Sequence, residues 1–235
     1  MCGRFTLTQS AEAIAEHFEL EESPFLAPRY NIAPTQPVAV VRAAQNDRQF
    51  THLHWGLIPS WSKDPTMGAR LINARAETVA EKPSFRSALK YRRCLIPADG
   101  FYEWQRIKDK KQPYWFGLDD RQPFAFAGLW EHWQSPDGSE IESCTIITTA
   151  ANALMQSIHD RMPVILEPQD YEQWLDPAVQ KGDRLQSLLR PYSDEAMLTY
   201  PVSTTVNNPR NDSPDCIEPT DAIEPQPTAA SPNSQ

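Results

Sequence analysis

Runs of aromatic and β-branched residues, broken by short polar segments, occupy the middle of the chain. Five such runs cover residues 92–98, 100–107, 113–118, 124–130 and 141–149. Runs of this length and composition are typical of β-strands. Two more, 38–43 and 49–58, flank the polar segment 44–47 and predict a hairpin. With a late strand at 197–203, the pattern predicts an antiparallel sheet that closes toward a barrel.

Helical patterns are short and lie outside these runs. Residues 8–20 begin with Thr and Ser and carry apolar residues at Ile14, Ala15 and Phe18, the spacing of a short amphipathic helix. Four more helices are predicted at 82–90, 151–158, 167–175 and 183–190. Twenty-three aromatic residues supply a core, and 22 Pro against 8 Gly argues against a helical bundle. We expect one folded domain in these 235 residues.

The cysteines and the hydropathy exclude several classes of protein. The four cysteines, Cys2, Cys94, Cys144 and Cys216, form no C-x-x-C pair, which predicts neither a disulfide framework nor a zinc site. No stretch approaches the roughly 18 apolar residues that cross a bilayer, and the start of the chain lacks the apolar core of a secretion signal. We expect a cytoplasmic protein without metal, cofactor or membrane partner, associated with the nucleoid in a bacterium or nuclear in a eukaryote.

Charge is distributed unevenly along the chain. The formal net charge of −9 by itself argues against a nucleic-acid partner. Residues 212–235, however, hold five acidic residues and no basic one, whereas residues 70–93 hold seven basic and two acidic residues. The pattern predicts a body at 1–211 with a basic face, followed by an acidic, Pro- and Ser-rich tail at 212–235 that is disordered from about Pro214.

Cys2 directly follows the initiator methionine, which is usually removed when the second residue is small. Removal of Met1 would give Cys2 both a free α-amine and a thiol. The amine, with an ordinary pKa of about 7.7 to 8.0, can form a Schiff base with an aldehyde, and the thiol can then close a thiazolidine ring. A terminal cysteine can equally be an acyl-transfer nucleophile that uses its own amine as the base. The remaining alternative is a small buried residue without chemistry.

Two other residues are candidates for proton transfer. Glu103 lies among the aromatic residues of 101–104, where a carboxyl group tends to a raised pKa, although a surface Glu alternating with core aromatics fits the same pattern. His159 follows a predicted helix, and imidazole shuttles protons near neutral pH; a charged helix end is the alternative. His52 and His54 share one strand face without a third ligand, so we interpret them as structural.

Candidate nucleic-acid contacts lie in two loops. Asn73 and two arginines, Arg70 and Arg75, fall in a loop expected before a helix. Arginine suits bidentate phosphate recognition, and ordinary ion pairing with Glu77 is the alternative. Trp61 lies on a Pro-containing loop, where it can either stack on an unpaired base or anchor the core.

Eight sequence blocks, in order, carry a resemblance to a known family. They are MCGRF, RYNIAPTQ, WGLIPSW, INARAET, RRCLIPADGFYEW, AGLWE, TTAAN and HDRMPVIL. The chain resembles the SOS-response-associated peptidase (SRAP) domain family, which shields abasic sites in single-stranded DNA. The blocks extend to about residue 166, and 201–219 is similar to the family's C-terminal segment. The resemblance implies an α+β fold with a curved, largely antiparallel, barrel-like β core and flanking helices.

The resemblance also implies roles for particular residues. Cys2 matches the family's nucleophile, and Asn73 matches the amide that positions the sugar and the terminal amine. Glu103 matches the acid/base that opens the deoxyribose ring, and His159 matches the imidazole that handles the sugar hydroxyl. The DNA contacts implied are phosphate-binding Arg75 and Arg161 and the cleft residues Asn31, Pro34, Trp61 and Thr148.

The implied function is covalent capture of an abasic site in single-stranded DNA. The ring-opened deoxyribose aldehyde would react with Cys2 to give a thiazolidine DNA–protein cross-link, with an associated lyase activity through the Schiff base. We expect the protein to act on this DNA as a monomer. Two alternatives stay open: a cysteine peptidase that uses Cys2 with Glu103 or His159, and a domain that binds single-stranded DNA without chemistry.

Overall fold

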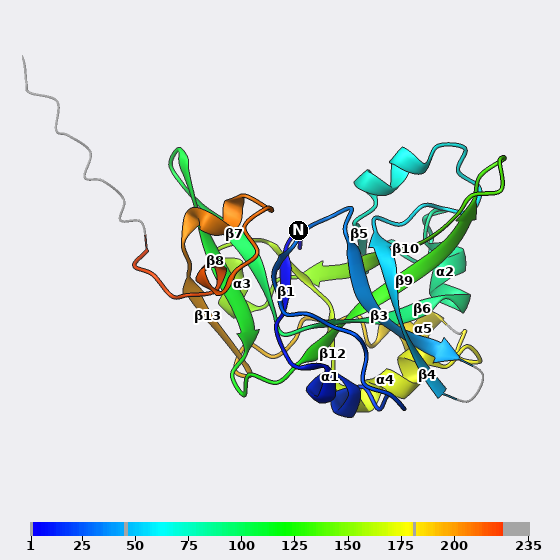
Figure 1. Ribbon diagram of the computed structural model, residues 1–235, viewed down its shortest axis with the longest axis horizontal. Helices are drawn as coiled ribbons and strands as arrows, with labels where there is room; N and C mark the ends of the chain where they lie inside the picture. Colours follow the sequence, from blue (N-terminus) through cyan, green and yellow to red (C-terminus); the bar gives the residue numbers. More distant parts are fainter. Residues whose placement is uncertain (1, 45–46, 181, 223–235) are drawn as a thin grey trace, which may run out of the picture.

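The computed structural model describes residues 2–44, 47–180 and 182–222 (Figure 1). The β-strands are β1 (Phe5–Leu7), β2 (Arg29–Ile32), β3 (Pro37–Ala44), β4 (Asp47–Trp55), β5 (Asn73–Arg75), β6 (Arg93–Ala98), β7 (Gly100–Ile107), β8 (Lys110–Leu118), β9 (Phe124–Gln134), β10 (Glu140–Ala150), β11 (Arg161–Pro163), β12 (Ile165–Leu166) and β13 (Met197–Pro201). The α-helices are α1 (Ala11–His17), α2 (Arg86–Tyr91), α3 (Ala153–Gln156), α4 (Tyr171–Leu175) and α5 (Gly182–Gln186). Short 3₁₀ helices are η1 (Pro65–Arg70), η2 (Pro168–Asp170), η3 (Thr204–Asn207) and η4 (Pro214–Cys216).

Strands from the middle of the chain close into a barrel. Around the ring, β10 pairs with β4, β4 with β3, β3 with β6, β6 with β9, and β9 pairs back with β10. Within this ring only the β4–β10 contact is parallel. The hairpin predicted from the sequence is formed by β3 and β4, in register from Pro37 opposite His54 to Ala44 opposite Asp47. The predicted α+β class with a largely antiparallel, barrel-like core is confirmed.

A second sheet, in the order β13-β8-β7-β1-β2, packs against the barrel through aromatic side chains. The ring of Phe5, in β1, lies edge-on 5.2 Å from Trp55 and 5.6 Å from Phe126. Phe101, from the neighbouring β7, lies 6.0 Å from the same Phe126. Ring pairs in this geometry contribute about 0.5 to 1.5 kcal/mol each beyond the burial of their area. The first strand of the chain is therefore held between a sheet neighbour on each side and the barrel beneath it.

The other face of this second sheet is covered by the C-terminal part of the chain. Tyr102 and Trp115 project from β7 and β8 and are buried under Val202, Val206 and Cys216. The hydroxyl group of Tyr102 donates a hydrogen bond to the carbonyl oxygen of Tyr30 at 2.6 Å, which satisfies its polar end inside this cluster. The segment after β13 thus supplies three of the five buried residues of a small second core.

The helices are shorter than the sequence patterns predict. Helix α1 lies within the predicted 8–20 range and is capped at its N-terminus by Ser10, whose hydroxyl oxygen accepts a hydrogen bond from the amide of Ala13. The range 151–158 forms only the four residues of α3, because the chain bends at once to enter β11. Within the described residues, no helix is long and apolar enough to cross a membrane.

Several short strands have no counterpart in the sequence analysis. The clearest is β5, where we expected a loop before a helix. Its three residues lie beside β10 in a parallel register, with Asn73 opposite Ile146 and Arg75 opposite Thr148, and a turn rather than a helix follows. A three-residue strand with two polar members has no period-two signal of its own, since its pairing is set by the barrel strand next to it.

The expectation of disorder from about Pro214 is wrong for residues 214–222. Residues Pro214–Cys216 form η4, and the Cys216 side chain is fully buried in the second core. The remaining residues of the predicted tail, 223–235, lie outside the described residues.

The acidic residue Asp212 explains why this segment is ordered. Its carboxylate pairs with Arg29 and accepts hydrogen bonds from the backbone amides of Tyr30 at 2.5 Å and Asn31 at 3.0 Å. These amides belong to the edge strand β2, which would otherwise leave them without a strand partner on that side. The sequence predicts that Asp212 belongs to a solvated tail, but in the structure its carboxylate binds the edge strand β2.

We predict that a chain ending at Asn211 is less stable than one ending at Ala222. The shorter chain loses the Asp212 contacts and the burial of Cys216, which together are worth about 2 to 4 kcal/mol. Urea unfolding monitored by tryptophan fluorescence measures the difference, with the 235-residue chain as the control. Equal midpoints for all three chains would contradict this assignment.

Candidate active site at the start of the chain

Cys2 lies at the junction of the two sheets, three residues before Phe5, the first residue of β1. Its side chain is fully buried, and its carbonyl oxygen accepts a hydrogen bond from the Asn73 side-chain amide at 2.8 Å. In Figure 1 the start of the chain lies between β7 on one side and β5 on the other. The structure thus brings Cys2 and Asn73, which are 71 positions apart in sequence, into direct contact.

Asn73 reaches Cys2 because β5 is held rigidly by β10. The parallel register sets Asn73, Ala74 and Arg75 opposite Ile146, Ile147 and Thr148. Ala74 is buried, so the residues on either side of it point the other way, toward the start of the chain or the surface. The Asn73 carbonyl oxygen Oδ1 is buried and has no hydrogen-bond partner among the described residues, so it is an acceptor available to a ligand.

Glu103 lies on the other side of Cys2, on β7. The pairing of Phe5 with Phe101, and a 3.0 Å hydrogen bond from the Tyr102 amide to the Arg4 carbonyl oxygen, align β7 with the first residues of the chain. Glu103 is only 4% exposed, so the interpretation as a surface residue between core aromatics does not hold. The Glu103 carboxylate is close enough to Cys2 for its charge to act on the thiol.

Burial raises the pKa of the Cys2 thiol well above its usual range, and the negative charge of Glu103 raises it further. Both causes disfavour the thiolate. All four cysteines of the chain are free and buried, so burial alone does not distinguish Cys2. Its neighbours Asn73 and Glu103 do.

His159 lies in the turn between α3 and β11. Its Nδ1 accepts a hydrogen bond from the backbone amide of Arg161 at 2.9 Å, which leaves the proton of the neutral ring on Nε2. The exposed carboxylate of Asp160 also lies 3.1 Å from Nδ1, but only a protonated ring could donate to it. The turn is tied to β7 by a 3.2 Å hydrogen bond from the Gln105 side chain to the Ser157 carbonyl oxygen.

Arg161 is already engaged by the protein. Its guanidinium donates two hydrogen bonds to the Glu77 carboxylate, at 2.6 and 3.0 Å, and one to the Thr148 carbonyl oxygen at 2.6 Å. The bonds from Arg161 lower the pKa of Glu77, with a smaller contribution from Arg75. Glu77 therefore pairs mainly with Arg161 rather than with Arg75, whose side chain is exposed. Thr148 is fully buried beneath this pair.

Asn31 is buried rather than exposed to a ligand. Its side-chain amide donates to the carbonyl oxygens of Val206, Asn208 and Asn211, and its Oδ1 accepts a 2.7 Å hydrogen bond from Arg4. Arg4, which the sequence analysis does not single out, also lies against the Trp104 ring at 5.7 Å. Its membership in the block MCGRF is the only signal in the sequence that could have marked it.

Trp61 is one of the few large apolar side chains on the surface, with 57% of its area exposed. The loop that carries it is held by a 2.7 Å hydrogen bond from the Trp133 indole to the Ser62 carbonyl oxygen. Exposure excludes the alternative in which Trp61 anchors the core. Pro34 is half-buried in a tight turn, and Thr35 next to it has a positive φ of 69°.

The basic stretch 70–93 does not form one continuous face. Arg93 is buried, and its guanidinium donates to the carbonyl oxygens of Leu89 and Trp174, while burial lowers its pKa. Arg92 pairs with Glu131 at 2.7 Å. These two arginines hold α2 and α4 on the barrel, so fewer of the basic charges of residues 70–93 are available to an anionic ligand than the sequence predicts.

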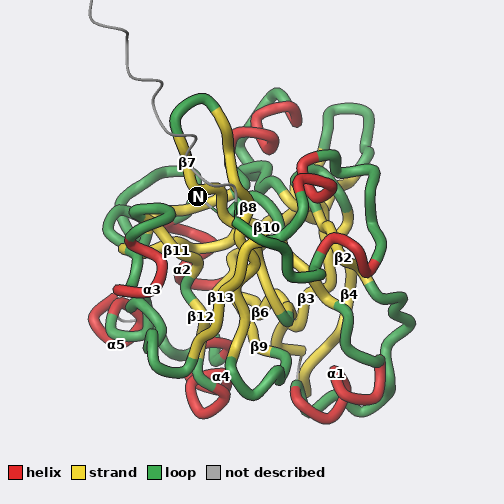
Figure 2. Tube along the Cα trace, turned by 90° about the vertical axis from the view of Figure 1, so that its left-hand side faces the viewer, coloured by secondary structure: helices red, strands yellow, loops and turns green. Residues whose placement is uncertain are grey.

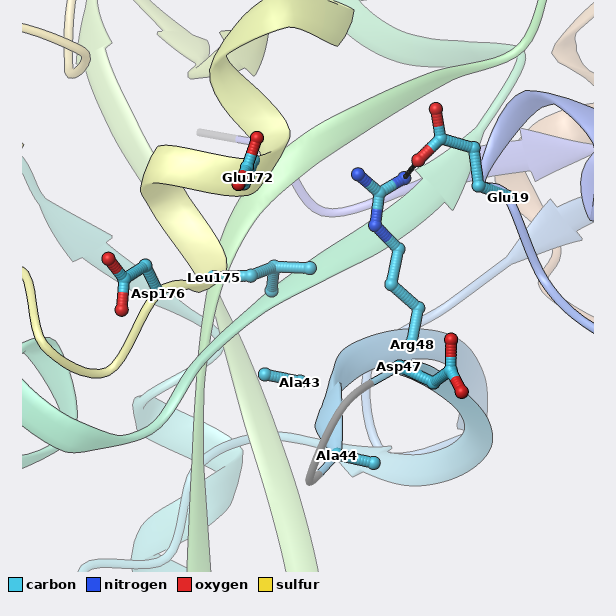
Figure 3. Close-up of a pocket in the computed structure, with 8 residues that line it drawn as sticks. All are labelled: Glu19, Ala43, Ala44, Asp47, Arg48, Glu172, Leu175 and Asp176. Carbon is cyan, nitrogen blue, oxygen red and sulfur yellow. Dashed lines mark ion pairs between the residues drawn. The ribbon is translucent and has the colours of Figure 1, made fainter.

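A surface pocket at the opposite end of the molecule has the wrong charge for a polyanion (Figure 3). Figures 1 and 2 both show its elements, α1, α4 and the start of β4, at the end away from the N-terminus. Its charged lining consists of Glu19, Asp47, Arg48, Glu172 and Asp176. Arg48 is neutralised by Glu19 at 3.0 Å, which leaves three carboxylates in excess. No group of three or more His, Cys, Asp or Glu in the described part of the chain is arranged to hold a metal ion.

Comparisons with known proteins identify one family. The family model for SOS response associated peptidase (SRAP) matches residues 1–209. The abasic site processing protein YoqW of Bacillus subtilis is 48% identical over 224 residues, which cover 93% of this chain and 99% of that protein. The abasic site processing protein HMCES of Xenopus tropicalis is 36% identical and covers 81% of this chain and 65% of that protein.

Solved structures share the fold of this chain. A crystal structure of a Bacteroides thetaiotaomicron protein superposes with a TM-score of 0.83 at 28% identity, covering 93% of this chain and all of that one. A Bordetella bronchiseptica protein superposes with a TM-score of 0.74 at 26% identity, covering 86% of this chain and all of that one.

We predict that Cys2 resists alkylation in the folded protein. Because the thiol is buried and its pKa is raised, iodoacetamide at pH 8 should label it at least roughly tenfold more slowly than in denaturant. Mass spectrometry of the N-terminal peptide measures the rate. Labelling at the same rate in both conditions would show that the thiol is open to solvent.

Proposed function

Because the chain belongs to the SOS response associated peptidase (SRAP) family, we propose that it captures abasic sites in single-stranded DNA through a covalent bond to Cys2. The names of its relatives YoqW and HMCES, both abasic site processing proteins, support the substrate. The single observation that carries the proposal is the setting of Cys2, a buried thiol at the start of the chain between the Asn73 amide and the Glu103 carboxylate.

The proposed reaction has two bond-forming steps. After removal of Met1, which lies outside the described residues, the α-amine of Cys2 attacks C1′ of the ring-opened deoxyribose and releases water to form an imine. The thiol then adds across the C=N bond, with sulfur bonding to carbon and the proton going to nitrogen, to close a thiazolidine ring. Neither step needs a cofactor or an oxidant.

The raised pKa of Cys2 fits this order of steps. A thiolate present from the start could attack the aldehyde by itself, whereas a protonated thiol is a poor nucleophile and reacts only after the amine has formed the imine. When the imine is protonated, its positive charge lies beside the sulfur and lowers the thiol pKa, so the thiol ionises only once its partner has formed. The negative charge of Glu103 stabilises the same cation.

The neighbours of Cys2 support specific roles. Asn73 holds the Cys2 carbonyl and presents its free Oδ1, which suits a sugar hydroxyl or the terminal amine. Glu103 is suited to donate and accept the protons of ring opening and imine formation. His159, with its proton on Nε2, is suited to bond the sugar hydroxyl. The imine also allows loss of the 3′ phosphate by elimination, which would be the lyase activity, and ring closure would suppress it.

The DNA strand would be held by its phosphates and by stacking. Arg75 is exposed and available to a phosphate, whereas Arg161 would have to exchange its bond with Glu77 for one. Trp61 offers an exposed indole for an unpaired base. Pro34 and Thr148 would support these contacts. Asn31 would act indirectly, by seating Arg4.

A cysteine peptidase that uses Cys2 is the second candidate, and the family description supports it by name. Acyl transfer needs a thiolate, or a base that makes one, before the substrate is attacked. Burial and the Glu103 charge both oppose that thiolate, so the Cys2 setting favours the aldehyde reaction.

We predict that the Met1-processed protein forms a denaturation-resistant adduct with an oligonucleotide that carries one abasic site. Cys2→Ala should abolish it, Cys2→Ser should give only an imine that borohydride can trap, and an N-terminal tag should prevent both, because thiol and amine must be adjacent. Gel electrophoresis and intact mass measure the products. Peptide cleavage without any DNA adduct would favour the peptidase, and binding unchanged by Cys2→Ala without an adduct would favour a non-catalytic reader.

We predict opposite effects of Glu103→Gln on two reactions of Cys2. Loss of the acid/base group should slow adduct formation by roughly 100-fold or more. Loss of the negative charge should lower the Cys2 pKa and speed iodoacetamide labelling. An unchanged melting temperature is the control for folding. An unchanged adduct rate would remove Glu103 from the reaction.

A further inference from the structure

The tip of the β7–β8 hairpin, residues 106–111, is strongly basic in an acidic protein. It carries Arg106, Lys108, Lys110 and Lys111 against the single carboxylate of Asp109, and the chain as a whole has a net charge of −9. All five charged side chains are exposed. The DNA contacts proposed above, at Arg75, Arg161 and Trp61, do not include this hairpin tip.

The charges of the hairpin tip repel one another within the protein. Arg106 and Lys111 are directly opposite each other across the two strands, a like-charge pairing that destabilises a hairpin. Arg29, Arg42, Arg48, Arg92 and Arg161 are all paired with carboxylates. Among the described residues, Arg106, Lys110 and Lys111 form no such ion pair. The unneutralised charge of the tip is complementary to an anionic partner.

The hairpin tip lies on the same side of the molecule as Cys2. Figures 1 and 2 both show the β7–β8 hairpin projecting beyond the sheet on the side of the N-terminus. Arg106 is three residues beyond Glu103 on β7, about 10 Å along the strand and on the opposite face, whereas Lys110 is paired with Ile107, which shares the face of Glu103. The hydrogen bond from Gln105 to the Ser157 carbonyl oxygen holds β7, directly before the hairpin tip, against the turn that carries His159.

We propose that the hairpin tip is a second phosphate-binding surface, which holds the DNA strand on one side of the abasic site. The identity of the anion rests on the proposed function. Two of the four cations are adjacent lysines, which suit the mobile phosphates of a single strand better than one fixed carboxylate. The tip has no aromatic side chain, so its contact is with the backbone and is independent of base sequence.

The arrangement also gives the strand a direction. The loop before η1, which carries Trp61, and the hairpin tip lie on opposite sides of the start of the chain (Figure 1). A strand whose abasic sugar reaches Cys2 would stack a base near Trp61 on one side and pass its phosphates over the hairpin tip on the other. Only the nucleotides on one side of the lesion then depend on the hairpin.

The first test measures binding of an undamaged 15-nucleotide oligothymidylate by fluorescence anisotropy at several salt concentrations. The variant is Arg106→Gln, Lys110→Gln and Lys111→Gln, and the matched control is Lys90→Gln, Arg184→Gln and Arg190→Gln, which removes three exposed charges elsewhere. At 0.1 M salt we expect the hairpin variant to bind roughly 10- to 100-fold more weakly, with the slope of log K against log salt smaller by about 1 to 2. Equal losses of affinity in both variants, or no loss in either, would overturn the proposal. In the second case an acidic protein would become the better candidate for the anionic partner.

The second test uses two 15-nucleotide strands with the abasic site near the 5′ end in one and near the 3′ end in the other. The hairpin variant should slow cross-linking at least roughly tenfold with one strand and leave the other within twofold of wild type. Equal slowing of both strands contradicts the proposal. If wild type cross-links neither strand, the proposed function fails, and the anisotropy test still decides the hairpin. The melting temperature of the variant should not fall, since the change removes repulsion.

Discussion

The hydrogen bond from the Asn73 amide to the Cys2 carbonyl oxygen joins the first residue of the described chain to the barrel. Chain ends are usually mobile unless other contacts hold them. Cys2 lies three residues before Phe5, the first residue of β1, and β1 is paired on both sides and packed by Phe5 onto the barrel. The geometry around Cys2 depends on those contacts.

The C-terminal part of the chain contributes to the same constraint from the opposite side. Residues 202–217 cover the outer face of the second sheet, and the carbonyl oxygen of Val206 accepts from both Arg4 and Asn31. Arg4 is two residues from Cys2, so residues near the end of the described chain help to fix its start. This explains why an apparently dispensable acidic stretch is built into the fold through Asp212.

Electrostatics divides the molecule into two ends. Around the α1–α4 pocket the carboxylates are in excess, whereas the exposed Arg75 and the hairpin tip lie on the side of the chain start. A polyanion is therefore attracted to one end and repelled from the other, and the net charge of −9 does not oppose DNA binding at the first. Arg161, beside Thr148, is paired with the Glu77 carboxylate. A phosphate that binds Arg161 would have to displace that carboxylate.

The sequence by itself determined the strands with strong alternation, the β3–β4 hairpin, the fold class and, through its ordered blocks, the family. These features are local, since burial of alternate side chains leaves a period-two pattern in the residues themselves. Only the tertiary structure decided that Asn73 sits on a strand, that Asn31 and Arg93 are buried, and that Asp212 ends a contact rather than begins a tail. Each of these positions depends on a contact with a residue far away in sequence, so the residue type alone does not predict it. For Cys2 the sequence supplied the functional groups, and the fold supplied the neighbours that set the pKa of its thiol.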